Sequence, residues 1–201
     1  MILIGVNVED IRRVLYKLEP EKQNKTLQKA LKATAEQARA RLAEKAQDSY
    51  TIKNAGFKKA MRIRATSGSS PEATIYAAGA PIPLKNFKVS KAKNTLRAQV
   101  VKQGKLKELE RGGIKAFINN IAHKGQTRGK DTKKGTAGSA VRHIAVAQRK
   151  GKERLKINEK YSSSVPAMLG SQKHVYGLVE PYIAGDLQMN LRKFVDQTLG
   201  G

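Results

Sequence analysis

The sequence has no cysteine and no tryptophan, and only 4 Phe and 6 Tyr among its 201 residues. Without cysteine, the chain has no disulfide framework, thiolate zinc site or thiol chemistry. No apolar run approaches the roughly 20 residues that a membrane-spanning helix needs. The opening Met1–Val6 is too short for a secretory signal and lacks its basic start. We therefore expect no membrane partner.

Acidic residues are also scarce, with 16 Asp and Glu against 40 Lys and Arg, a net charge of +24. Residues 1–50 hold 10 basic and 7 acidic residues, residues 51–160 hold 27 and 6, and residues 161–201 hold 3 of each. The excess therefore lies in the middle of the chain. Such a segment repels itself unless anions, acidic partners or neighbouring subunits screen its charge.

Apolar residues at helical spacing predict helices at both ends of the chain. Asn7 is a suitable N-cap for a short first helix, and Pro20 suits the first position of a longer helix that runs to about Asp48. Pro181 is predicted to begin the last helix, which Gly200 closes. The expected apolar stripes are Ile11, Val14, Leu15 and Leu18; Leu27, Leu31, Ala35, Ala38, Leu42 and Ala46; and Ile183, Leu187, Leu191, Phe194, Val195 and Leu199.

The middle of the chain alternates or forms short apolar runs, which is typical of strands. Turn-forming residues separate these runs, and residues 124–139 contain four Gly among several Lys and Arg, which predicts a long exposed loop. The strands are expected at 61–64, 73–78, 96–100, 114–121, 143–148 and 155–157, and the turns at 67–71, 79–83, 112–113 and 150–152.

These patterns predict an α+β fold, in which a long N-terminal helix and a C-terminal helix pack around a mostly antiparallel β-sheet with a long basic Gly-rich loop. We expect a single domain over residues 1–201. Its parts are a helical 1–50, a basic β-rich 51–160 with the loop 124–139, and a helical 161–201.

The residues that could carry catalysis or bind metal are few and scattered. The three His residues lie far apart and match no metal-binding spacing. Glu108 and Glu110 stand among lysines, where paired carboxylates are usually solvated partners of those lysines. The Gly129–Gly138 segment lacks the order of a phosphate-binding loop, and no serine lies in a nucleophile elbow. We expect no catalytic, cofactor or metal site and no enzymatic activity.

A dense basic tract with interspersed glycines suits sequence-independent contact with phosphates. Base-stacking aromatic residues and a recognised nucleic-acid-binding signature are both missing from it. Contact with DNA and contact with acidic protein surfaces in an assembly are therefore both open. The residues predicted to make these contacts are Lys124, Arg128, Lys130, Lys133, Lys134, Arg142, Arg149, Lys150, Lys152 and Arg154.

Four motifs follow one another in a distinctive order, namely Ala80–Lys85, Gly113–Ile118, His143–Ile157 and Tyr161–Met168. In this order, and in the long Ala-rich helix followed by Tyr50–Lys53, the chain resembles the minor tail protein Z family of long-tailed bacteriophages and prophages. The resemblance spans about residues 10–199. Two departures are Lys156, where the family usually has Pro, and Ser162-Ser163, where Gly-Pro is common.

The resemblance implies a virion structural protein that acts in tail completion at the head-proximal end of the tail, after assembly in the host cytoplasm. It implies a homo-oligomeric ring, with a hexamer favoured, beside tail terminator, tail tube or head–tail connector proteins. The basic residues would then face non-specifically bound phage DNA in the lumen, or acidic subunit surfaces. The alternative is a free, sequence-independent nucleic-acid-binding protein that uses the same basic region.

Overall fold

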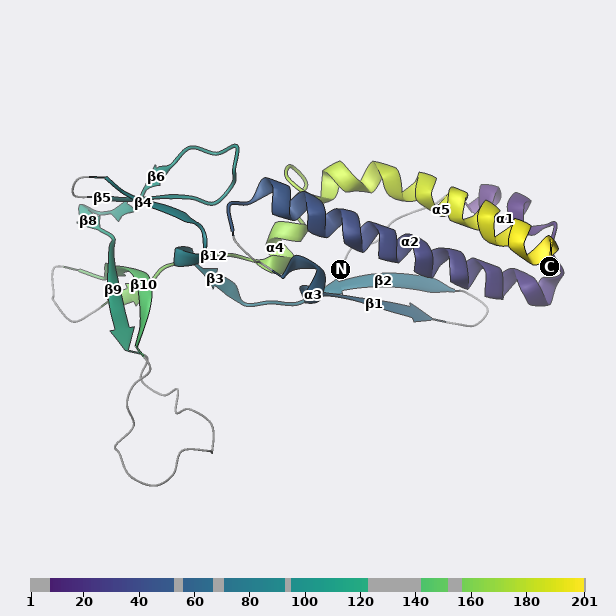
Figure 1. Ribbon diagram of the computed structural model, residues 1–201, viewed down its shortest axis with the longest axis horizontal. Coiled ribbons are helices and arrows are strands. Elements are labelled where there is room, and N and C mark those ends of the chain that lie inside the picture. Colours follow the sequence, from purple (N-terminus) through teal and green to yellow (C-terminus); the bar gives the residue numbers. More distant parts are fainter. Residues whose placement is uncertain are drawn as a thin grey trace, which may run out of the picture. The chain divides into compact units, whose positions relative to one another are not determined.

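The computed structural model describes residues 8–52, 56–66, 71–92, 95–122, 142–151 and 157–200 (Figure 1). The chain divides into two compact units. The first, which we call the helical unit, is made from three segments, Met1–Ser49, Asn54–Ala80 and Ser163–Gly201. The second, the strand unit, comprises Tyr50–Lys53 and Pro81–Ser162. The strand unit is thus inserted within the sequence of the helical unit.

In its described residues, the helical unit combines five helices with one β-hairpin (Figure 1). The long helices α2 and α5 pack on each other, and the antiparallel hairpin β1–β2 lies along α2. No described helix is long and apolar enough to span a bilayer. The elements are α1 (Val8–Leu15), α2 (Pro20–Ser49), α3 (Phe57–Ala60), β1 (Met61–Thr66), β2 (Glu72–Ala77), α4 (Val165–Leu169) and α5 (Tyr176–Leu199).

The helix α2 begins at Pro20 as the sequence predicts, and it ends within one residue of the predicted Asp48. Its buried face contains two threonines, Thr26 and Thr34, whereas Leu27 and Leu31 of the predicted stripe are only partly buried. A buried hydroxyl is stable where it is hydrogen-bonded. Thr34 meets this requirement because its Oγ1 donates to the Ala30 carbonyl over 2.8 Å.

A row of polar contacts fixes the antiparallel register of α2 against α5. The contact partners on α5 move toward its N-terminus as those on α2 move toward its C-terminus, so one alignment satisfies them all. Each contact fills a position that an apolar pair would otherwise occupy, and a shift by one turn would leave buried polar groups unpaired. The contacts are Thr26 with Thr198 (3.4 Å), Thr34 with Asn190 (2.9 Å), Gln37 with Asn190 (3.0 Å) and Arg41 with Asp186 (2.6 Å).

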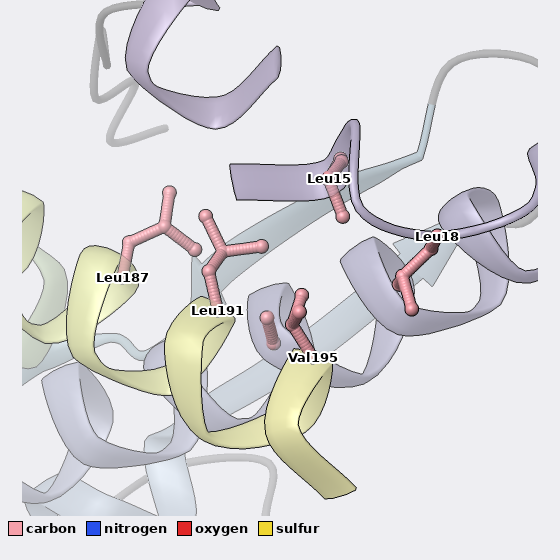
Figure 2. Packing of buried hydrophobic residues seen from close by; sticks show 6 residues of the cluster. Leu15, Leu18, Leu187, Leu191 and Val195 are labelled. Atoms are coloured by element: carbon pink, nitrogen blue, oxygen red, sulfur yellow. The ribbon is translucent and has the colours of Figure 1, made fainter. Parts of the chain in front are cut away.

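The apolar core of this unit closes where α1 and the turn after it meet the C-terminal half of α5. Leu187, Leu191 and Val195 of α5 lie beside Leu15 and Leu18, as Figure 2 shows. Ala30 of α2 belongs to the same cluster, and its small side chain lets the helices approach closely. The predicted stripes of α1 and α5 therefore meet each other in this cluster.

The predicted start of the last helix at Pro181 is wrong, because α5 begins five residues earlier at Tyr176. Proline removes a main-chain N–H, so a helix interior normally excludes it. Here Val175, Tyr176 and Val179 are all buried, and their burial stabilises the first turns of the helix. The tertiary contacts outweigh the local cost of Pro181.

The strand unit consists of short strands in several small sheets (Figure 1). Two three-stranded antiparallel sheets, β4–β5–β6 and β9–β10–β11, and the antiparallel pair β7–β8 account for most of it, and β3 pairs with β12. The elements are β3 (Pro81–Pro83), the 3-10 helix η1 (Leu84–Asn86), β4 (Lys88–Ala92), β5 (Thr95–Gln99), β6 (Lys107–Glu108), β7 (Glu110–Arg111), β8 (Ile114–Lys115), β9 (Phe117–Ala122), β10 (Arg142–Arg149), β11 (Ile157–Glu159) and β12 (Tyr161–Ser164).

The structure confirms the α+β class, with a long N-terminal helix, a C-terminal helix and antiparallel sheets. It also confirms the turn at Gly112-Gly113, where positive φ angles of 58° and 73° favour glycine. The predicted turn at 79–83 is wrong for Pro81–Pro83, which form the short strand β3. Proline suits such an edge position because its fixed φ is compatible with extended backbone there. The predicted loop 124–139 lies outside the described residues.

One tyrosine of the helical unit links stability to alkaline pH. Burial, a 2.9 Å hydrogen bond to Glu180 and the charge of that carboxylate raise the pKa of Tyr176 from 10.0 to about 12. A raised pKa means that the protonated phenol is favoured in the folded state, so its contribution is complete below pH 10 and is lost as the pH rises toward 12. We expect the free energy of unfolding to fall less steeply over this window in Tyr176→Phe than in the wild type.

Urea unfolding at several pH values would measure this effect. Tyr16→Phe is the matched control, since Tyr16 is 88% exposed and its substitution should leave the alkaline slope unchanged. Identical slopes for wild type and Tyr176→Phe would contradict the prediction.

Candidate anion-binding groove

The two units divide the net charge unequally. The strand unit holds 23 Lys and Arg against 5 Asp and Glu, a net +18, whereas the helical unit holds 17 against 11, a net +6. A charge density of this kind attracts anions through the summed field of the unit. The strand unit is therefore where an anionic partner would bind.

The structure describes three of the basic residues that the sequence predicts to make such contacts. Arg142 and Arg149 stand at opposite ends of β10, roughly 23 Å apart at 3.3 Å per residue, and Lys150 follows Arg149. Arg149 and Lys150 are exposed. The other predicted residues, Lys124, Arg128, Lys130, Lys133, Lys134, Lys152 and Arg154, lie outside the described residues.

A groove of about 810 Å³ lies on the strand unit, between η1 with the start of β4 and the turn that follows β5. Three exposed lysines line it, and none of the described residues that line it is a carboxylate. The lining residues are Thr51, Lys85, Asn86, Phe87, Lys88, Val89, Gln99 and Lys102.

Thr51 holds the two walls of the groove together. Its Oγ1 donates to the carbonyl of Gln99 on β5 and accepts from the main-chain N–H of Lys88 on β4 over 3.2 Å. The main-chain N–H of Thr51 also donates to the Val100 carbonyl over 2.9 Å. One residue therefore positions the main chain that carries Lys88.

Gln99 performs a similar task for the third lysine. Its Nε2 donates to the carbonyls of Lys102 (2.8 Å) and Gly104 (2.6 Å), and the Gly104 N–H donates to the Val101 carbonyl over 2.9 Å. These bonds close the turn over residues 101–104. The backbone of Lys102 is therefore fixed, and only its side chain must be ordered when a ligand binds.

The register of the sheet separates the groove lysines from a neutralised arginine. Lys88 pairs with Gln99 and Ser90 pairs with Arg97, so these four side chains share one face of β4–β5. Glu108 of β6 pairs with Arg97, and its carboxylate accepts from the guanidinium at 2.6 Å and 3.1 Å. Within the described residues, no carboxylate forms an ion pair with Lys85, Lys88 or Lys102.

Lys85, Lys88 and Lys102 do not stand out as a group in the sequence. Lys85 and Lys88 stand in a short segment beside prolines, and Thr51 and Lys102 are remote from them in the sequence. Only the pairing of β4 with β5, and the bridge between Tyr50 and Val101, bring the three segments together. The available signal was a run of lysines without nearby acidic residues.

The groove offers three ammonium groups and the side-chain amide of Asn86, whereas the amide N–H groups of Gln99 are already used to close the turn over residues 101–104. Ammonium groups and amide N–H groups are donors for oxyanions. Among the described residues, no group of three His, Asp or Glu is placed to hold a metal ion. The chemistry that this arrangement supports is reversible binding of an anion.

Replacing Thr51 with valine removes the hydroxyl that joins β4 to β5 and leaves the Lys88 N–H without its acceptor. We expect a loss of about 1 kcal/mol in the free energy of unfolding, typical of a lost hydrogen bond whose exposed donor can bind water instead. Thr51→Ser retains the hydroxyl and should recover most of the loss. Urea unfolding of the three proteins measures it, and equal stability of the Val and Ser variants would contradict the assignment.

Comparisons of the chain with protein-family models, with curated protein sequences and with solved structures find no significant match.

Proposed function

We propose that the protein is a structural component of a long-tailed phage or prophage-derived particle, in which it completes the tail at its head-proximal end. The observation that carries the proposal is the order of motifs that resembles the minor tail protein Z family. In the structure, the second motif supplies β8 and the start of β9, and the third supplies most of β10 and the start of β11; β9, β10 and β11 form one antiparallel sheet. Their roles as strands agree with a structural function.

The last motif also has a structural role in this chain. The Ser164 Oγ accepts from the Ala167 N–H over 3.4 Å, and Pro166 occupies the first turn of α4. Both are standard ways to begin a helix. The motif marks the point where the chain leaves β12 and enters α4, and Val165 at that point is buried.

The charge distribution suits a subunit of a ring. Copies of a chain with a net charge of +24 repel each other unless their basic surfaces face anions or acidic neighbours. In the proposed ring, the strand unit with its net +18 faces DNA in the lumen or acidic surfaces of tail terminator, tail tube or connector subunits. The less charged helical unit supplies the contacts between copies.

Deletion of the gene from the producing phage or prophage tests the proposal. Heads and tails should accumulate unjoined, or tails should have irregular ends, and the gene supplied from a plasmid should restore complete particles. Negative-stain electron microscopy and infectivity measure the outcome. Normal particles in normal yield after deletion would contradict the proposal.

A second candidate function is sequence-independent nucleic-acid binding by the free protein, which the lysine-lined groove favours. The two functions differ in where the protein is found. A tail completion protein co-purifies with particles in stoichiometric amounts and is needed for their assembly. A free nucleic-acid-binding protein is absent from particles, and its deletion leaves particle assembly unchanged.

A further inference from the structure

We infer that the groove formed by η1, the start of β4 and the turn after β5 is a binding site for the phosphodiester backbone of nucleic acid, with Lys85, Lys88 and Lys102 as the contacting residues. None of these lysines belongs to the basic tract that the sequence predicts as the contact region. The inference deepens the proposed function, because it names the anion that the strand unit binds. It rests on that function only for the setting in which the contact takes place.

The charges of the groove favour an extended polyanion. Three ammonium groups line one groove, no carboxylate among the described residues neutralises them, and Glu108 pairs with the nearby Arg97 instead. A single small anion can engage few of these groups at once, whereas a chain of phosphates can engage each lysine separately. Each such contact releases condensed counterions from the nucleic acid, which supplies most of the binding free energy.

The lining also favours a phosphate backbone over an acidic protein. The cores of protein interfaces are anchored by exposed aromatic or apolar side chains that enter pockets on the partner. Phe87, the one aromatic side chain among the described lining residues, is 5% exposed and belongs to the core of the strand unit. The rim that remains accessible includes the three lysines and the amide of Asn86, which are phosphate ligands.

The same lining predicts binding without sequence preference. Proteins that stack bases use exposed aromatic platforms, and the part of the groove that the structure describes exposes none. Thr51 and Gln99 hold the main chain at Lys88 and Lys102, so only the side chains of these two lysines must be ordered when the ligand binds. Thr51 is thus a positioning residue for the site, and its hydroxyl does not need to touch the ligand.

The experiment compares the full chain with the triple variant K85Q/K88Q/K102Q, using a short fluorescein-labelled DNA duplex of mixed sequence and fluorescence anisotropy over a range of salt concentrations. The affinity of the variant should fall on the order of 100-fold at about 0.1 M salt. The slope of log K against log salt should become shallower by about 0.9 for each lost contact, or nearly 3 in total. A duplex of different sequence should give the same affinity.

The matched control is K91Q/K107Q/K115Q, which removes the same charge from the same unit. Lys91 and Lys107 occupy the opposite face of β4–β5–β6 by register, and all three control lysines are exposed. The control should lose much less affinity than the groove variant. Equal losses would overturn the inference, because they would show a diffuse field instead of a defined site. Circular dichroism melts establish that both variants are folded.

A charge-restoring variant gives a second, independent readout. E108Q releases Arg97 on the groove face without removing any lysine, so DNA affinity should rise several-fold. If neither E108Q nor K85Q/K88Q/K102Q changes the affinity for DNA, the groove is not the binding site. Tighter binding of poly-glutamate than of DNA at equal charge would overturn the choice of ligand.

These outcomes are separate from the test of tail completion. If the purified protein does not bind DNA, but deletion of the gene leaves heads and tails unjoined, the inference is wrong and the proposed function stands. If the groove binds DNA, but particles are normal after deletion, the proposed function is wrong and the inference stands.

Discussion

Replacing Leu191 with alanine is expected to lower the free energy of unfolding by about 3–5 kcal/mol, the range for a large buried aliphatic side chain. Leu191 is 0% exposed and lies between Leu187 and Val195 on α5, beside Leu15 and Leu18 (Figure 2). Truncation would leave a cavity that these neighbours cannot fill, because they are anchored on three different helical and turn segments. Urea unfolding followed by far-ultraviolet circular dichroism measures the loss.

The matched control for this substitution is Leu199→Ala at the end of the same helix. Leu199 is 54% exposed, so its truncation creates no buried cavity and should change the free energy of unfolding by less than about 1 kcal/mol. Similar losses for the two leucines would show that the cluster of α1 and α5 does not exist as described.

The second large effect is expected when Arg41 is replaced by methionine. Arg41 reaches Asp186 with two contacts, Nη1 to Oδ2 at 2.6 Å and Nη2 to Oδ1 at 3.1 Å, and its guanidinium also lies 5.5 Å from the centre of the Tyr182 ring. The side chain of Asp186 is 8% exposed and that of Arg41 is 41% exposed. Removing the arginine therefore leaves a buried carboxylate without its partner, and we expect a loss of about 3 kcal/mol.

The asymmetry of exposure makes the prediction specific. Asp186→Ala leaves an arginine that can turn to water, so this variant should lose less stability than Arg41→Met. The double variant Arg41→Met/Asp186→Leu removes both charges and should recover most of the loss. Lys22→Met, in the exposed pair of Lys22 with Glu19 at 3.2 Å, is the control and should cost under about 0.5 kcal/mol. A double variant as unstable as Arg41→Met would refute this account.

The sequence predicted those parts of the fold that depend on local periodicity. The start of α2 at Pro20 and the glycine turn at Gly112-Gly113 follow from the conformations of single residues. The row of polar contacts between α2 and α5 does not, because Thr34 looks like an ordinary surface residue until Asn190 is known to face it. The true start of α5 was missed for the same reason, since it depends on tertiary burial of Val175.

The candidate site shows the same limit more strongly. Charge density along the sequence indicates the basic region, and it favours the segment where lysines and arginines are most concentrated. The groove instead depends on the spacing of cations in three dimensions, which is set by Thr51 bridging β4 and β5. It depends equally on which charges are neutralised, and only the structure pairs Arg97 with Glu108.

The insertion of the strand unit into the helical unit dictates the order in which the chain can fold during its synthesis. All residues of the strand unit have been synthesised before α5 is made, because that unit ends at Ser162 and α5 begins at Tyr176. Until α5 has been made, the alanine-rich face of α2 is not covered by it, and Arg41 lacks its partner Asp186. The helical unit can close only after α5 has been made, so products truncated before α5 would expose the face of α2 that α5 covers and would be prone to aggregation.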